Sequence, residues 1–241
     1  DVPQPFPGPA DGLIYTPSNP DGQFRGPLNL RDAMAAGLLP PAVVVANSQG
    51  MSRILSTAHR IGLNSLDETS ADLSLLERGG AVSVLDTAYA YSVFAANGVM
   101  RGVDVEPIAR GYRARDPVAV LRIEDADGQV LWDHDEEQIA LSQTNIFEPG
   151  LAFLVNDILS DAETRSAVLS DERNLPALEQ RAALVSGSAG DGEDHWAVGY
   201  TPQILAAVHL SRSGDSEAAA DRTALDQAAP VWHDLMRYAS T

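Results

Sequence analysis

Helix-type patterning fills the first hundred residues of this 241-residue chain, whereas strand-type alternation fills its last third. Apolar and polar residues alternate at 181–187, 194–200 and 203–210, with turn signals between the segments. Consecutive strands joined by short turns pair antiparallel. The order therefore predicts an α+β fold, an antiparallel sheet flanked by helices, and not a parallel nucleotide-binding sheet.

The chain divides into an extended, Pro- and Gly-rich segment at 1–28 and one domain at 29–241. Helix starts are marked by Asn29 and Ser83, each followed three residues later by an aspartate. In chain order we expect a helical part at 29–100, a β-hairpin insertion at 104–133 with an Asp127-Gly128 turn, a helix at 147–170, strands at 181–210 and a closing helix at 223–240.

The charged residues exclude several classes of function. All sixteen basic residues are arginine, no lysine is present, and thirty-four carboxylates give a formal charge of −18. Such a surface repels nucleic-acid phosphates and anionic head groups, so neither a nucleic acid nor a lipid surface is expected as a partner. A neutral lysine amine cannot serve as a base here, because arginine stays protonated. The absence of cysteine excludes disulfides and thiolate sites.

No cofactor or metal is predicted. His59, His134, His209 and His233 are scattered without the spacing of metal ligands. Asp194 and His195 are adjacent on a predicted strand, so their side chains should point to opposite faces and not form a catalytic pair. The glycine-rich Gly187–Gly192 segment lacks the lysine and helix of a phosphate-binding loop, and it is predicted to be a turn.

Several segments in this order resemble the transpeptidase domain of class A penicillin-binding proteins, the enzymes that cross-link peptidoglycan. They are Tyr15–Met34 (YTPSNPDGQFRGPLNLRDAM), Asp86–Gly98 (DTAYAYSVFAANG), Ile158–Asp161 (ILSD), Asp194–Pro202 (DHWAVGYTP) and Ala229–Met236 (APVWHDLM). The last three look most like the branch sometimes called penicillin-binding protein one-C. The resemblance implies a penicillin-binding transpeptidase fold of the serine β-lactamase type, incomplete at its N-terminus in this chain.

The family uses three motifs, Ser-x-x-Lys, Ser-x-Asn and Lys-Thr-Gly. The first would fall before Asp1, and a chain without lysine cannot contain it. The resemblance places Gly37 and Leu39 at the serine and asparagine of the second motif. It places Val185 at the lysine of the third, with Ser186, Gly187 and Ser188 after it. These positions predict a degenerate site with no intact catalytic residue.

The resemblance therefore implies a catalytically inactive domain, with a scaffolding or peptide-binding role in peptidoglycan synthesis. Ser186, Gly187 and Ser188 could add a stem peptide as a strand, or they could form a strand edge without a ligand. Alternatives are an active D,D-transpeptidase whose serine and lysine lie upstream, and a non-catalytic protein-interaction module. The implied partners are the upstream part of the same protein and cell-wall synthesis proteins, and the implied location is the extracytoplasmic face of the bacterial cell membrane.

Overall fold

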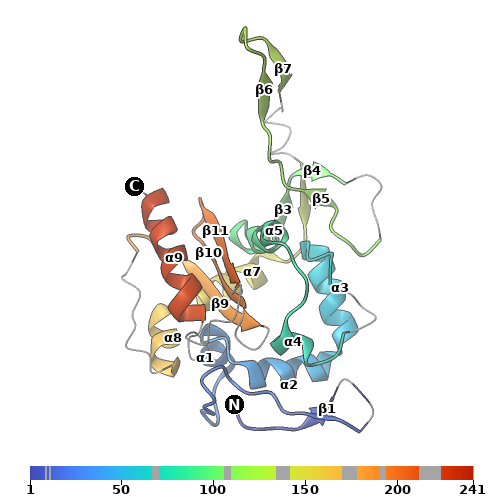
Figure 1. Ribbon diagram of the computed structural model, residues 1–241, viewed down its shortest axis with the longest axis vertical. Coiled ribbons are helices and arrows are strands. Elements are labelled where there is room, and N and C mark those ends of the chain that lie inside the picture. Colours follow the sequence, from blue (N-terminus) through green and yellow to red (C-terminus); the bar gives the residue numbers. More distant parts are fainter. Residues whose placement is uncertain are drawn as a thin grey trace.

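The computed structural model describes residues 1–8, 10, 12–66, 71–105, 110–133, 142–169, 178–189, 194–211 and 224–240 (Figure 1). Its helices are α1 (Leu30–Ala35), α2 (Leu39–Gln49), α3 (Met51–Ile61), α4 (Leu75–Arg78), α5 (Val84–Ala95), α7 (Pro149–Leu159), α8 (Ala162–Leu169) and α9 (Ala224–Ala239). Its strands are β1 (Phe6–Pro7), β2 (Ile14–Tyr15), β3 (Val99–Arg101), β4 (Val103–Asp104), β5 (Arg115–Asp116), β6 (Arg122–Glu124), β7 (Val130–Asp133), β8 (Gln143–Asn145), β9 (Ala183–Ala189), β10 (Asp194–Tyr200) and β11 (Leu205–Ser211).

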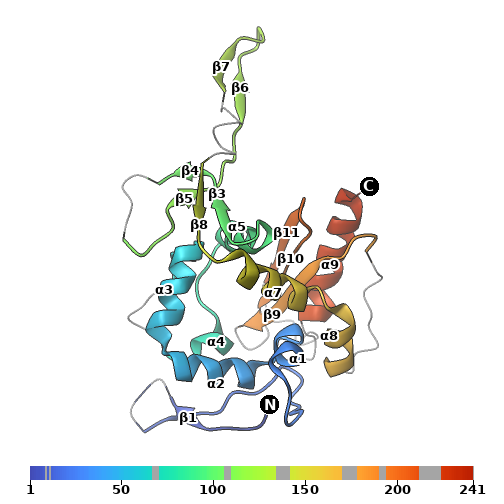
Figure 2. The ribbon, with the colours of Figure 1, turned by 180° about the vertical axis from the view of Figure 1, so that it is seen from behind.

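The centre of the molecule is an antiparallel sheet in the order β11-β10-β9. Helix α9 covers one face, where Trp232 and Met236 pack on Leu184 of β9 and Ala197 of β10. Helices α5 and α7 cover the other face, as Figures 1 and 2 show from opposite sides. Alternation along β9 sends Leu184 toward α9 and Val185 toward α5 and α7. The α+β architecture predicted from the sequence is confirmed.

Asn19 fixes the course of the first 28 residues. Its side chain is 3% exposed, and its amide nitrogen donates to the carboxylate of Asp1 and to the carbonyl of Gln23. Its amide oxygen accepts from the backbone N–H of Leu39, a distance of 3.0 Å, at the start of α2. A buried amide that is fully hydrogen-bonded therefore joins the extended segment to the first residue of α2.

Arg31 joins α1 to α7. Its guanidinium makes ion pairs with Asp157 and, at 2.9 Å, with Asp161. Arg181 also pairs with Asp157, at 3.0 Å. The hydrogen bond from Arg31, followed by that from Arg181, holds the pKa of Asp157 below its usual value. Because α1 leads directly into Gly37, this charge network positions the α1–α2 connection.

The predicted helical segments are observed, but the single helix expected at 147–170 is two helices, α7 and α8, with Ser160 as the C-cap of α7. Asn29 and Ser83 both accept from the backbone N–H of the aspartate three residues on. Other expectations were wrong. Residues 1–28, expected to contain no element, include the short pair β1–β2.

The predicted Gly187–Gly192 turn begins too early, although Gly187 also ended the strand predicted at 181–187. Gly187 and Ser188 lie within β9, paired with Trp196 and His195 of β10. The backbone hydrogen bonds of a neighbouring strand can override a weak local tendency to turn. Residues 190–192 of the predicted turn lie outside the described part of the chain. The hairpin is also shorter than its alternation suggests, because β6 begins only at Arg122 and a bulge follows Ile123.

Replacing Asn19 by alanine should lower the free energy of unfolding by about 2–3 kcal/mol, because its buried amide no longer hydrogen-bonds Asp1, Gln23 and Leu39. The exposed cap variant Asn29→Ala is the matched control and should cost about 1 kcal/mol. Urea unfolding followed by circular dichroism measures both. Equal losses in the two variants would contradict the role assigned to Asn19.

Candidate functional site

The outer edge of β9 is the centre of the candidate site. Strand β10 pairs with the inner edge of β9, and no described strand pairs with the outer edge. The carbonyl of Leu184 points outward, because it accepts from Nη1 of Arg165 at 3.3 Å. In an antiparallel pair alternate residues direct their N–H and C=O to the same side. The backbone groups of Ser186 and Ser188 therefore also face outward.

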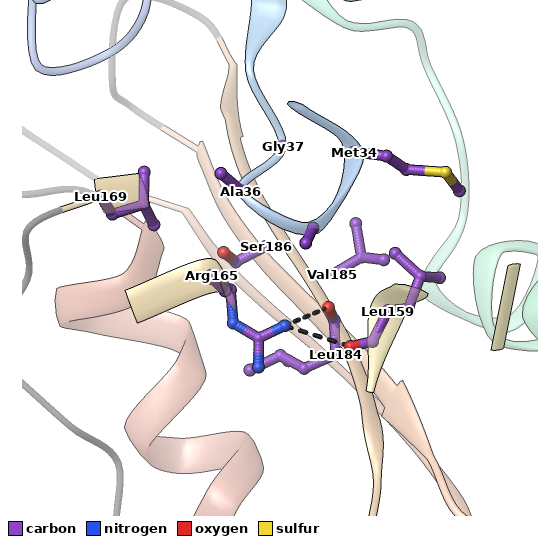
Figure 3. Close-up of a pocket in the computed structure, with 10 residues that line it drawn as sticks. Met34, Ala36, Gly37, Leu159, Arg165, Leu169, Leu184, Val185 and Ser186 are labelled. Atoms are coloured by element: carbon purple, nitrogen blue, oxygen red, sulfur yellow. Dashed lines mark hydrogen bonds between the residues drawn. The ribbon is translucent and has the colours of Figure 1, made fainter. Parts of the chain in front are cut away.

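A small pocket, partly open to solvent, lies beside this edge (Figure 3). It is lined by Met34, Ala35, Ala36, Gly37, Leu159, Arg165, Leu169, Leu184, Val185 and Ser186. The structure thus brings together three residues that the sequence singled out, Gly37, Val185 and Ser186. They come from the α1–α2 connection and from β9, which are far apart in the chain.

Gly37 adopts a left-handed backbone conformation, with φ of 64°. A Cβ atom added to it would lie 3.9 Å from the carbonyl oxygen of Ser186, which is an ordinary contact. The α1–α2 connection therefore lies directly against the outward carbonyl of β9. A side chain at Gly37 would have room, and only the backbone conformation would oppose it.

The other predicted site residues lie apart from the pocket lining. Leu39 packs with the N-terminal core around Phe6 and Val43. Gly187 has open space beside it. The hydroxyl of Ser188 is 3.1 Å from Nδ1 of His195, a buried side chain on β10. Ser188 therefore presents its outward backbone groups at the edge while its hydroxyl is hydrogen-bonded within the sheet.

Arg165 is the one charged residue of the pocket lining, and no motif in the sequence predicted its role. Its Nη1 donates to the carbonyls of Leu159, at 3.1 Å, and Leu184. Burial lowers the pKa of its guanidinium, and the nearby carboxylate of Asp161 partly opposes the shift. An arginine remains protonated even so. It stabilises the junction of α7, α8 and β9 and brings a positive charge to the pocket.

Asp194 and His195 point to opposite faces, as alternation predicts. Asp194 lies 3.0 Å from Nε2 of His209, whose ring stacks on Trp196. His195 contacts Ser188 instead. Within the described ranges, no three His, Asp or Glu side chains gather as metal ligands would. His134 lies outside those ranges.

Comparison with known proteins identifies the family that this geometry resembles. No protein-family model matches the chain. Penicillin-binding protein 1A of Neisseria meningitidis serogroup A is 28% identical over 99% of the chain. The crystal structure of penicillin-binding protein 1A from Haemophilus influenzae superposes with a TM-score of 0.70 at 17% identity, covering 100% of this chain and 38% of that one. The chain has a penicillin-binding protein transpeptidase fold.

A second structure supports the same fold. PonA1 of Mycobacterium tuberculosis superposes with a TM-score of 0.71 at 19% identity, over 98% of this chain and 61% of that one. The resemblance predicted from the sequence segments is thus confirmed, while the one-C branch stays a prediction. The chain spans 28% of the length of the meningococcal relative. Of the described helices, none is long and apolar enough to cross a membrane.

Replacing Gly37 by serine should lower the free energy of unfolding by about 1–2 kcal/mol because of the left-handed backbone at this position. Gly150→Ser is the matched control. Gly150 lies in the first turn of α7, without a left-handed conformation and with open space around it, so that change should be neutral or slightly stabilising. Thermal unfolding measures the stability of both variants. An unchanged free energy of unfolding in Gly37→Ser would contradict the backbone strain assigned to this position.

Proposed function

We propose that this transpeptidase-like domain is catalytically inactive and binds a peptide along the outer edge of β9 in peptidoglycan synthesis. The observation that carries the proposal is the composition of the pocket. Val185 and Gly37 supply no ionisable or hydroxyl group where the family motifs have a lysine and a serine. Arg165, its one charged residue, directs Nη1 to two backbone carbonyls.

The missing groups matter because transpeptidation needs proton transfer and charge stabilisation. A preorganised donor in an acyl-transfer site contributes about 3 kcal/mol to the transition state. That amounts to roughly a hundred-fold in rate for each group lost. Arg165 cannot replace a lysine as a base, since a guanidinium stays protonated. Even with a serine supplied from another part of a longer protein, acylation would be slow.

Peptide binding requires fewer functional groups in the site than acylation does. A peptide that adds as a strand is held by backbone hydrogen bonds, which Ser186 and Ser188 can provide at the edge of β9. Antiparallel to β9, such a peptide would direct its C-terminus toward Leu184 and Arg165. The guanidinium charge there favours a free carboxylate.

The partners and location follow from the same proposal. The chain spans about a quarter of the length of its relatives named penicillin-binding protein 1A, so the rest of such a protein would be its first partner. Its peptide ligand would be the stem peptide of peptidoglycan, and other partners would be cell-wall synthesis proteins. This function places the domain on the extracytoplasmic face of the cell membrane.

Strand addition is tested with an acetylated peptide ending in D-Ala-D-Ala, added to the ¹⁵N-labelled chain. We expect amide shifts at Ser186 and Ser188 and a saturable dissociation constant. Ser188→Pro removes an outward N–H without touching the β9–β10 ladder, so it should weaken binding by at least about tenfold, or 1.4 kcal/mol.

Ser188→Ala is the matched control, because it loses the hydroxyl but keeps the N–H. It should bind the peptide within about twofold of the parent chain, since a backbone-held strand does not need that hydroxyl. Absence of saturable shifts, or equal binding by Ser188→Pro, would overturn the proposed mode.

A further inference from the structure

The hairpin β6–β7 extends away from the body of the molecule, on the side opposite the N-terminus (Figures 1 and 2). The two strands pair with each other through Arg122↔Asp133 and Ile123↔Trp132. Every residue of β6 and β7 is exposed. An isolated two-stranded hairpin is marginally stable in water, so the pairing of β6 with β7 alone gives this hairpin little stability.

The two faces of the hairpin differ. Arg122 makes ion pairs with Glu124 and, at 3.5 Å, with Asp133, which places these three charged side chains on one face. Ile123 and Trp132 lie directly opposite each other on the other face, and Leu121 follows the same alternation. We name Leu121, Ile123 and Trp132 the apolar hairpin face. Leu121 is 48% exposed and Ile123 46%.

One charged face and one apolar face are typical of a ribbon that packs on something through its apolar side. Leu131, in the bulge beside this face, is 65% exposed. Contiguous apolar patches on protein surfaces mark interaction sites more often than isolated exposed residues do. The amphipathic pattern therefore indicates an interface.

The negative charge of the hairpin and of the whole chain indicates which kind of partner the apolar hairpin face would bind. From Leu121 to Asp133 one arginine stands against four carboxylates, a formal charge of −3, on a chain with a charge of −18. A second copy would bring the same negative charge to the interface, and like charges disfavour association. The N-terminus lies at the other end of the molecule (Figure 1). A separate, positively charged protein segment fits best.

We propose that the apolar hairpin face docks a basic, apolar strand of another protein. Within the described ranges no strand pairs with either outer edge of the hairpin, so a strand can be added there. The apolar hairpin face then covers alternate side chains of the added strand, and the carboxylates around the turn pair with its lysines or arginines. This interface is independent of the β9 edge and of any peptide bound there.

The absence of cysteine allows a clean test. Ile123→Cys carries a single environment-sensitive dye on the apolar hairpin face. Val45→Cys, on α2 at the far end of the molecule and 49% exposed, is the matched control. The probe is a capped peptide of alternating valine and lysine, compared with the same peptide bearing glutamate in place of lysine. A blue shift is expected only for the dye at position 123 with the lysine peptide.

The lysine peptide should bind at least about tenfold more tightly than the glutamate peptide. The difference should shrink in high salt, which screens exposed charges. Leu121→Asp in the labelled chain should abolish the shift. The proposal would be overturned if the dye responded equally to both peptides or to neither. It would also be overturned by a shift of the dye on adding unlabelled chain or on adding phosphatidylglycerol vesicles. The last two outcomes would assign the face to self-association or to a lipid surface.

Discussion

The contact between Gly199 and Trp232 is the constraint on which the sheet depends. A Cβ atom at Gly199 would collide with the indole ring and with the carbonyl of Ala183, so only glycine lets α9 approach the sheet this closely. Trp232, 3% exposed, fills that space and anchors α9 across all three strands. Helices α5 and α7 cover the opposite face of the sheet, and residues of α1 and α8 line the pocket beside the outer edge of β9.

A hydrogen-bond chain completes the other face. The hydroxyl of Tyr200 on β10 donates to Asn156 on α7, and the amide of Asn156 donates to the carbonyl of Phe94 on α5, at 2.7 and 2.8 Å. Burial raises the pKa of Tyr200 well above its ordinary value, so this hydroxyl remains a donor at every physiological pH. The hydrogen bonds on this face of the sheet therefore do not change with pH in the physiological range.

Local signals predicted most of this scaffold. Asn29 and Ser83 mark helix starts because their caps are formed within three residues, and the three long strands follow from alternation. The pairs β3–β8 and β4–β5 were missed because each joins two or three residues to partners more than ten positions away, without a local pattern. Ser188 was assigned to a turn because the glycines around it signal turns, and only the pairing with β10 makes it part of a strand.

The candidate site was likewise predicted only in part from the sequence. The motif order of the family located Gly37, Val185 and Ser186, and the fold brings them into one pocket. Arg165 was missed because nothing around it in the sequence indicates that α8 turns its guanidinium toward β9. Leu39 followed Gly37 in the motif, yet its side chain packs in another cluster. The spacing of motifs along a chain can locate backbone segments. The direction of a side chain depends on tertiary packing, which motif spacing does not predict.

The central claim is that a transpeptidase fold is retained here without acylating chemistry. The most direct measurement is the intact mass of the natural protein that contains this domain, after incubation with benzylpenicillin, with an active class A penicillin-binding protein as the positive control. The account predicts an unchanged mass for the protein and an adduct on the control. A stoichiometric penicilloyl adduct mapped to a serine would contradict it.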